Sequence, residues 1–488
     1  MDKTARATFG TKLGIIAATA GSAVGLGNIW RFPSQTAQDG GAIFVFVYLA
    51  CVAFFGVPIV LAEFILGRAG KANSARAYRN LAPGGWFHVF GYFSISAAFL
   101  IMGFYMVVAG WTLEYLRLSL TGELASTNDF GALFSSLTND AGTQIGWMAV
   151  FVLGTGGIVA FGVKKGIELA SKLMMPLLLL VMLVLCVRAL TLPGAGAGLS
   201  YLFAPNLETA GDAGARLLTD ALGQSFFSLS VGMGTLMTYA SYFGRDVRLA
   251  KTAGTMAALD TAVALLAGVI IFPAAFALAA HPESMVETLK AGGPGLVFIS
   301  IPQLLQSLPA AQVWSVFFFL LLVLASLTST ISLFEVITAF VHEEVRVTLP
   351  KKIFSPRGEA AGTGETAVSP GTLRQEYRIA RPFAAVVIAA GIIALGVFCA
   401  CSLGENSALR LFGLSFFDFL DFLTAKLMMP LGGIFISLFA GRRLDKKILE
   451  AEYSNAGTLS LRFFKVYRFI LRWIAPAGIA VVLVCGLF

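Results

Sequence analysis

Long apolar segments dominate this sequence and restrict what it can fold into. Runs of roughly 18 to 30 mainly apolar residues alternate with short basic stretches along the 488-residue chain. About 20 apolar residues in a helix cross the hydrocarbon core of a bilayer, whereas barrel strands need short alternating segments. Only 13% of the residues are charged, about half the fraction in soluble domains. The pattern predicts an all-α integral membrane protein and excludes a soluble enzyme and a disordered chain.

Eleven membrane spans account for the apolar runs. We predict them near 13–35, 42–66, 88–116, 145–162, 168–192, 217–242, 252–279, 312–345, 380–402, 411–440 and 464–488. Most of the 35 basic residues fall in loops on one side of these spans. The loop-charge rule therefore places the N-terminus in the cytoplasm and the C-terminus outside, in the cell inner (plasma) membrane. The net charge of +8 reflects this topology, so we expect no nucleic-acid partner.

The first and sixth spans share an unusual glycine pattern. Gly25-Leu26-Gly27 and Gly232-Met233-Gly234 each lie in mid-span, beside small polar residues. Paired interrupted spans in corresponding positions indicate an inverted repeat with a binding site at the membrane midplane. We therefore divide the chain into a first repeat (1–200), a second repeat (201–440) and a last span (441–488), within one transport domain. Close helix packing through small residues is the alternative explanation.

Ionisable residues inside the predicted spans are candidates for function, because they are costly to place in lipid. Arg31 follows the first-span glycines, Asp260 lies in the seventh span and Asp421 in the tenth. Arg31 and Asp421 both lie toward the outer side, so we expect an ion pair above the midplane. Snorkelling to the membrane interface is the alternative for Asp421.

Hydroxyl groups also occur deep within spans. Thr328 and Ser329 belong to a dense Ser/Thr cluster in the eighth span, and Tyr105 lies in the middle of the third. The cluster could coordinate Na⁺, a hard cation that prefers oxygen ligands. It could equally bond back to carbonyl groups one turn earlier. The Tyr105 hydroxyl needs a partner, either a substrate carboxylate or a neighbouring helix.

Two segments that contain these residues resemble a known family. GSAVGLGNIWRFPSQTAQDGGAIF (21–44) resembles the first-span signature of the neurotransmitter:sodium symporter family, and GQSFFSLSVGMGTLMTYASY (223–242) resembles its sixth span. The resemblance extends over essentially the whole chain and is closest to the bacterial sodium-coupled hydrophobic amino acid transporters. It implies a leucine-transporter-like fold, a 5+5 inverted repeat with broken helices 1 and 6 that works by alternating access.

The resemblance also implies roles for individual residues. One sodium ion would be held, together with the substrate carboxylate, by Ala23 (carbonyl), Asn28, Ser228 and Asp260. A second would be held by the carbonyl groups of Gly21, Val24 and Ala325 and the hydroxyls of Thr328 and Ser329. The substrate would contact Ala23, Gly25, Leu26, Gly27, Ile101, Tyr105, Phe227, Ser228, Ser230, Met233, Ser329 and Leu333. The outer gate would be Arg31 with Asp421, capped by Phe227 and Tyr105, and the inner gate would be Arg6 with Glu343, aided by Phe9 and Tyr242.

Two departures from other family members refine the expected substrate and ions. Amine carriers of the family have an Asp where this chain has Gly25, so the ligand must bring its own carboxylate and should be an amino acid. Asp260 and Ala264 stand where the leucine transporter has Asn and Glu. The fixed charge of Asp260 should replace the chloride that eukaryotic members need. The apolar pocket, with the flexible Met233, should accept branched and aromatic L-amino acids.

Other functions remain as alternatives. An amino-acid exchanger or a proton-coupled carrier on the same fold would show no sodium dependence. A sensor or channel without coupled transport is a further possibility. An enzyme is not expected, because His88, His281 and His342 lie at span or loop ends and form no catalytic set. Besides the amino acid, the expected partners are membrane lipid and a second copy of the chain in a homodimer.

Overall fold

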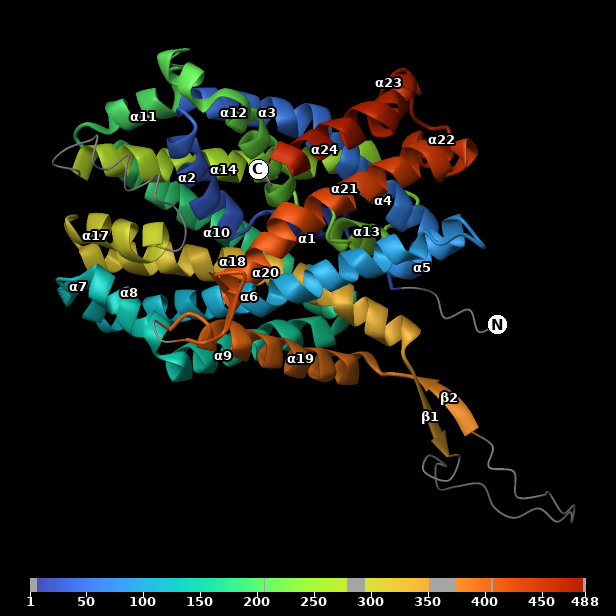
Figure 1. Ribbon diagram of the computed structural model, residues 1–488, viewed down its shortest axis with the longest axis horizontal. Coiled ribbons are helices and arrows are strands. Elements are labelled where there is room, and N and C mark those ends of the chain that lie inside the picture. Colours follow the sequence, from blue (N-terminus) through green and yellow to red (C-terminus); the bar gives the residue numbers. More distant parts are fainter. Residues whose placement is uncertain (1–6, 206, 279–294, 351–373, 405–406, 486–488) are drawn as a thin grey trace, which may run out of the picture.

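Long helices that run side by side make up most of the protein (Figure 1). The computed structural model describes residues 7–205, 207–278, 295–350, 374–404 and 407–485. In this part, nine helical stretches are long and apolar enough to cross a membrane. Several include a π-helical segment, labelled η. The nine are α3-η2-α4 (Ala42–Cys51, Val52–Gly56, Val57–Gly70), α6 (His88–Thr121), α9 (Ala141–Ala160), η3-α10 (Val163–Ile167, Glu168–Leu190), α14 (Leu249–Leu278), α18 (Ala311–Glu344), α19 (Arg381–Cys401), α20-η6-α21-η7 (Phe416–Asp421, Phe422–Met428, Met429–Leu438, Phe439–Arg443) and α23-η8-α24 (Phe464–Phe469, Ile470–Ile474, Ala475–Cys485).

A bent pair of helices occupies the position of the first predicted span. α1 (Lys12–Ala23) begins where the Thr11 side chain accepts a hydrogen bond from the backbone N–H of Gly14. It ends where Val24 turns extended, and the chain continues as η1 (Gly27–Arg31) and α2 (Phe32–Gln38). The two halves meet at 54°. Counted as one span, the pair raises the number of spans in the described part to ten.

The sixth predicted span, 217–242, is not one continuous helix. α12 (Leu207–Ser228) and α13 (Thr235–Ala240) are separated by residues 229–234, and the backbone of α12 itself is non-helical at Gly214. The glycine pattern therefore coincides with an interruption of the helix in both places.

Two long helices form the centre of the molecule. α6 and α18, each of 34 residues, pack along one another, and α9 and α19 pack against both. Their interior faces are almost continuously apolar or small, so the helices approach closely. The opposite face of α18 contacts α1, α10 and α13, which places the interrupted helices beside the central pair.

Short elements connect the spans. The remaining helices are α5 (Ser74–Leu81), α7 (Glu123–Ser126), α8 (Phe130–Asn139), α11 (Ala195–Phe203), η4 (Leu296–Ser300), α17 (Ile301–Gln306) and α22 (Lys446–Tyr453). Two antiparallel strand pairs complete the described part: β1 (Arg346–Pro350) with β2 (Arg374–Arg378), and β3 (Arg410–Leu411) with β4 (Leu414–Ser415). β1 and β2 extend from the end of α18 beyond the helices (Figure 1).

Candidate functional site

Side chains compensate for the backbone groups freed where α1 ends. The Asn28 side-chain oxygen accepts a hydrogen bond from the backbone N–H of Gly25 (3.0 Å), and the backbone N–H of Asn28 donates to the Gly25 carbonyl (3.2 Å). From α12, the buried Gln224 side chain donates to the carbonyl of Gly27 (3.2 Å). In lipid each unpaired backbone group would cost several kcal/mol, so the interruption depends on these partners.

A buried carboxylate has the same role between α12 and α13. Glu63 on α4 accepts hydrogen bonds from the backbone N–H groups of Gly232 (2.8 Å) and Met237 (3.2 Å). Gly232 and Gly234 have φ angles of 88° and 74°, which side chains with a Cβ rarely adopt. The Gly-x-Gly pattern is therefore needed for the shape of the chain here, and Glu63 stabilises that shape.

A small central cavity lies between the two interruptions. It has a volume of about 30 Å³. Its lining comprises Ser22, Ala23, Gly25, Gly27, Ile101, Tyr105, Phe227, Ser228, Ser230, Met233, Ser329 and Leu333. Eleven of the twelve residues expected to contact substrate thus come together around one cavity. Leu26 instead lines a second cavity next to it, and Ser22 was not among the predicted residues.

The glycines of the first interruption allow very close packing at this cavity. A Cβ atom on Gly25 would lie 2.5 Å from Ser329 Oγ and 3.1 Å from the Tyr105 hydroxyl oxygen. A Cβ on Gly27 would lie 2.6 Å from the Phe227 ring. The backbone N–H of Leu26 donates to the Tyr105 hydroxyl (3.3 Å). No carboxylate side chain fits at Gly25 in this packing.

The polar residues predicted for the first sodium site form one buried cluster. Asn28 donates to Asp260 Oδ1 (2.8 Å) and to Ser228 Oγ (3.0 Å). Ser228 in turn donates to Asp260 Oδ2 (2.6 Å). The Asp260 side chain is fully buried, and no Lys or Arg in the described ranges pairs with it. An isolated buried carboxylate is strongly disfavoured, so the cluster suits a bound cation.

The predicted second sodium site also gathers oxygen atoms, between α1 and α18. Ser329 donates to the Val24 carbonyl (2.9 Å), and Thr328 lies 3.3 Å from the same oxygen. Thr328 Oγ1 also lies 2.9 Å from the Ala325 carbonyl. Its bond within α18 is the local alternative raised by the sequence, and the contacts to Val24 come in addition to it. Gly21 packs here too, because its Cβ would lie 3.3 Å from the Thr328 Cβ.

A larger cavity of about 350 Å³ adjoins the central one, and we call it the vestibule. Its lining includes Arg31, Asp421, Phe227, Tyr105 and Leu26. Phe227, Tyr105 and Gly27 border both cavities and so separate them. The guanidinium of Arg31 lies over the Phe227 ring, 4.5 Å from its centroid, a cation–π contact. Arg31 and Asp421 line the same cavity, but no ion pair joins these two described residues.

The predicted inner gate is described in part. Arg6 lies outside the described residues, so its pairing with Glu343 stays a prediction. Glu343 accepts hydrogen bonds from the backbone and side-chain nitrogens of Asn73, both 2.9 Å. Phe9 packs edge-on against Tyr242, with ring centroids 6.3 Å apart. The Tyr242 hydroxyl donates to the buried Glu335 (2.6 Å).

The sequence did not assign roles or partners to several residues that contribute to the site. The Tyr48 hydroxyl reaches Ser228 at 3.5 Å, and Glu335 is ion-paired with Arg381 at the start of α19. Gln224 and Glu335 could have been singled out from the sequence, because each is a polar residue inside an apolar run. Tyr48 carries no distinct signal, because it lies in an aromatic-rich stretch.

Comparison with known proteins identifies the class of protein to which this site belongs. The profile of the Sodium:neurotransmitter symporter family (SNF) matches residues 6–129 and 128–356. The chain therefore belongs to the sodium:neurotransmitter symporter family. It is a sodium-dependent membrane transporter of a small-molecule substrate, not an enzyme.

Individual relatives share most of the chain. The uncharacterized sodium-dependent transporter YhdH of Bacillus subtilis (strain 168) is 32% identical over 476 residues, covering 97% of this chain and 96% of the relative. The creatine transporter of Torpedo marmorata is 31% identical over 367 residues, covering 66% of this chain and 59% of its own. The crystal structure of MhsT in complex with L-phenylalanine matches with a TM-score of 0.82 and 38% identity, over 98% of this chain and 99% of that one. The predicted family and helical membrane fold are confirmed.

Proposed function

We propose that this protein is a Na⁺-coupled symporter of hydrophobic and aromatic L-amino acids that works without chloride. The observation that carries the proposal is the cluster of Asn28, Ser228 and Asp260 at the edge of the central cavity. It combines a buried carboxylate with neutral oxygen donors, a set that fits a hard monovalent cation. Ser228 belongs to both the cluster and the cavity lining, so a ligand in the cavity would contact the ion site.

The second oxygen cluster supports sodium coupling in the same way. Ser329 lines the central cavity and bonds to the Val24 carbonyl, beside Thr328. Each proposed ion site therefore shares a residue with the substrate cavity. An ion that orders these residues raises the affinity for substrate, and substrate raises the affinity for the ion by the same factor. The inward sodium gradient would then drive accumulation of the amino acid.

The cavity lining supports a hydrophobic amino acid as the substrate. Ile101, Phe227, Met233 and Leu333 supply apolar surface, and Met233 can adapt to side chains of different shape. No Lys, Arg, Asp or Glu is among the lining residues, so a charged substrate side chain would be buried without a partner. MhsT, which matches this chain closely, was crystallised with L-phenylalanine. We expect branched and aromatic L-amino acids to bind, and acidic and basic ones to be rejected.

The fixed charge of Asp260 supports independence from chloride. Its carboxylate lies within the proposed first sodium site, and Ala264, one turn further along α14, offers neither charge nor hydrogen-bond donor to an anion. An added anion would therefore meet a negative group and an apolar methyl group. The carboxylate itself balances the sodium charge.

Alternating access would follow from movement of the interrupted helices against the α6–α18 centre. We propose that the inverted repeats span 1–200 and 201–440, with the last span at 441–488. Arg31 and Asp421 would approach to close the outer gate, while Arg6, Glu343, Phe9 and Tyr242 would close the inner one. We further propose that the protein lies in the cell plasma membrane as a homodimer, with its N-terminus in the cytoplasm and its C-terminus outside.

Equilibrium binding of a tritiated amino acid panel to purified protein, in sodium and then in potassium, tests this function. Hydrophobic amino acids should bind only in sodium, and Asn28→Ala or Thr328→Ala should abolish that binding. Thr338→Ala is the matched control, because Thr338 is also buried on α18 and its hydroxyl donates to the Phe334 carbonyl one turn earlier.

Equal binding in the two salts would contradict sodium coupling and favour the exchanger or proton-coupled carrier. Displacement of tracer by glutamate or lysine as effective as that by leucine or tryptophan would contradict the substrate class.

A further inference from the structure

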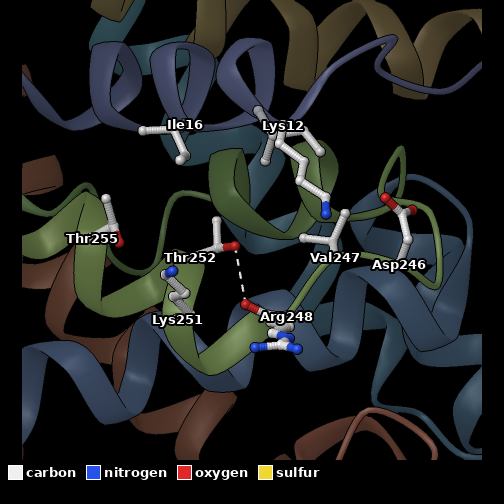
Figure 2. Close-up of a pocket in the computed structure, with 9 residues that line it drawn as sticks. Lys12, Ile16, Asp246, Val247, Arg248, Lys251, Thr252 and Thr255 are labelled. Atoms are coloured by element: carbon white, nitrogen blue, oxygen red, sulfur yellow. Dashed lines mark hydrogen bonds between the residues drawn. The ribbon is translucent and has the colours of Figure 1, made fainter. Parts of the chain in front are cut away.

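A cavity outside the transport site lies between α1 and the start of α14 (Figure 2). Its volume is about 250 Å³. Lys12 and Ile16 reach it from α1, and Arg248, Lys251 and Thr252 from the opposite side (Figure 2). It shares no lining residue with the central cavity or with the vestibule.

The charged residues of this cavity are unbalanced. Lys12, Arg248 and Lys251 supply three positive charges, and Asp246 is the one acidic residue of the lining. None of these four forms an ion pair within the described ranges. Arg68, by contrast, is paired with Glu452 at 2.5 Å. The cavity therefore carries unneutralised positive charge and attracts an anion.

The position and walls of the cavity indicate the kind of anion. It lies where α14 begins, on the side that the loop charges assign to the inner membrane face. Anionic lipids concentrate on that face. Ile15, Ile16 and Val247 form an apolar wall next to the basic groups. A phospholipid presents a phosphate beside its glycerol and acyl chains, which matches basic and apolar walls side by side.

We propose that this cavity binds the phosphate of an anionic phospholipid and so links α1 to α14. Lys12 contacts the phosphate from one helix, and Arg248 and Lys251 contact it from the other. Because α1 also supplies oxygen atoms to both proposed ion sites, the lipid stabilises the arrangement of α1 against α14 seen in the structure. The inference does not depend on which amino acid is transported.

Native mass spectrometry of delipidated protein, titrated with dioleoylphosphatidylglycerol or dioleoylphosphatidylcholine, tests the proposal. The lipid-site variant is Lys12→Gln/Arg248→Gln/Lys251→Gln. The matched control is Lys446→Gln/Lys447→Gln/Arg462→Gln, which removes three exposed charges from elsewhere on the same expected side. Each basic group near a membrane surface changes lipid affinity about fivefold, so three at one site change it on the order of 100-fold.

The proposal predicts tighter binding of the first phosphatidylglycerol than of phosphatidylcholine. The lipid-site variant should lose that preference, and the control should stay within about twofold of the wild type. Both variants should keep wild-type melting temperatures in phosphatidylcholine alone, which checks their folding. Equal losses in the two variants would show diffuse surface attraction and overturn the site. Displacement of the lipid by millimolar inorganic phosphate would assign the cavity to a soluble anion and overturn the lipid assignment.

Discussion

Replacing Asp260 with Asn removes one charge from the proposed first sodium site while it keeps the side-chain shape. In the structure both carboxylate oxygens are engaged, at 2.8 Å from Asn28 Nδ2 and 2.6 Å from Ser228 Oγ. The side chain is fully buried, so solvent screens the lost charge little. Two unit charges about 4 Å apart interact by about 4 kcal/mol at an effective dielectric constant of about 20.

An amide oxygen retains part of that attraction, so we expect a loss of about 2 to 4 kcal/mol. This corresponds to roughly 30- to 1,000-fold weaker sodium binding at this site. Sodium titration of tritiated ligand binding, with potassium as the replacement cation, measures the shift. The titration should be repeated with gluconate in place of chloride.

The wild type should bind equally well in chloride and gluconate. Asp260→Asn should need much more sodium, and chloride should partly restore its affinity, because the anion can supply the missing charge. Ser437→Ala, on α21, is a control for removal of a buried hydrogen-bonding side chain remote from the cluster. A sodium dependence unchanged in Asp260→Asn, or wild-type binding lost in gluconate, would refute the reasoning.

Three further predictions follow from particular contacts. Gly25→Ala places a Cβ 2.5 Å from Ser329 Oγ and should weaken amino acid binding about 5- to 150-fold. Gly223→Ala is the control and should bind like the wild type, because no neighbouring group in the described part of the structure lies within 4 Å of its new Cβ. The pKa of Asp39 is raised from 3.8 to about 7, mainly because the side chain is buried and secondly because the Asp220 carboxylate lies nearby on α12. The folded state then holds this proton more tightly than the unfolded state, so stability should fall as the pH rises from about 4 to about 7, and Asp39→Asn should flatten that slope in melting temperatures. Glu168 accepts a 2.6 Å hydrogen bond from the backbone N–H of Gly10, two residues before α1. Glu168→Gln should therefore speed hydrogen exchange at Gly10 about 10- to 100-fold, and unchanged exchange would argue against this contact.

The sequence was most informative where membrane physics leaves few alternatives. Apolar length located the spans, and the two Gly-x-Gly patterns located both interruptions, because an interrupted helix in lipid needs unusual residues. The assignment of individual residues to the cavity came from the family resemblance. Motif positions within one segment carry over well, since their relative placement is fixed by a single local structure.

Contacts between distant segments could not be predicted in the same way. Glu63 is a carboxylate inside the second predicted span, but its partners, Gly232 and Met237, lie far along the chain. Arg31 and Asp421 were expected to pair; they line one cavity without a direct ion pair. The separation of these two side chains would depend on how far the proposed outer gate is closed, and residue types do not encode that.

The central claim is that an inward sodium gradient drives uptake of a hydrophobic amino acid. The most direct test is accumulation of tritiated L-leucine or L-phenylalanine by proteoliposomes, with sodium outside and potassium inside, in chloride-free buffer. The account predicts accumulation above the external concentration, abolished by a sodium ionophore and absent in Asn28→Ala. Equal uptake without a sodium gradient, or uptake driven by a proton gradient alone, would contradict it.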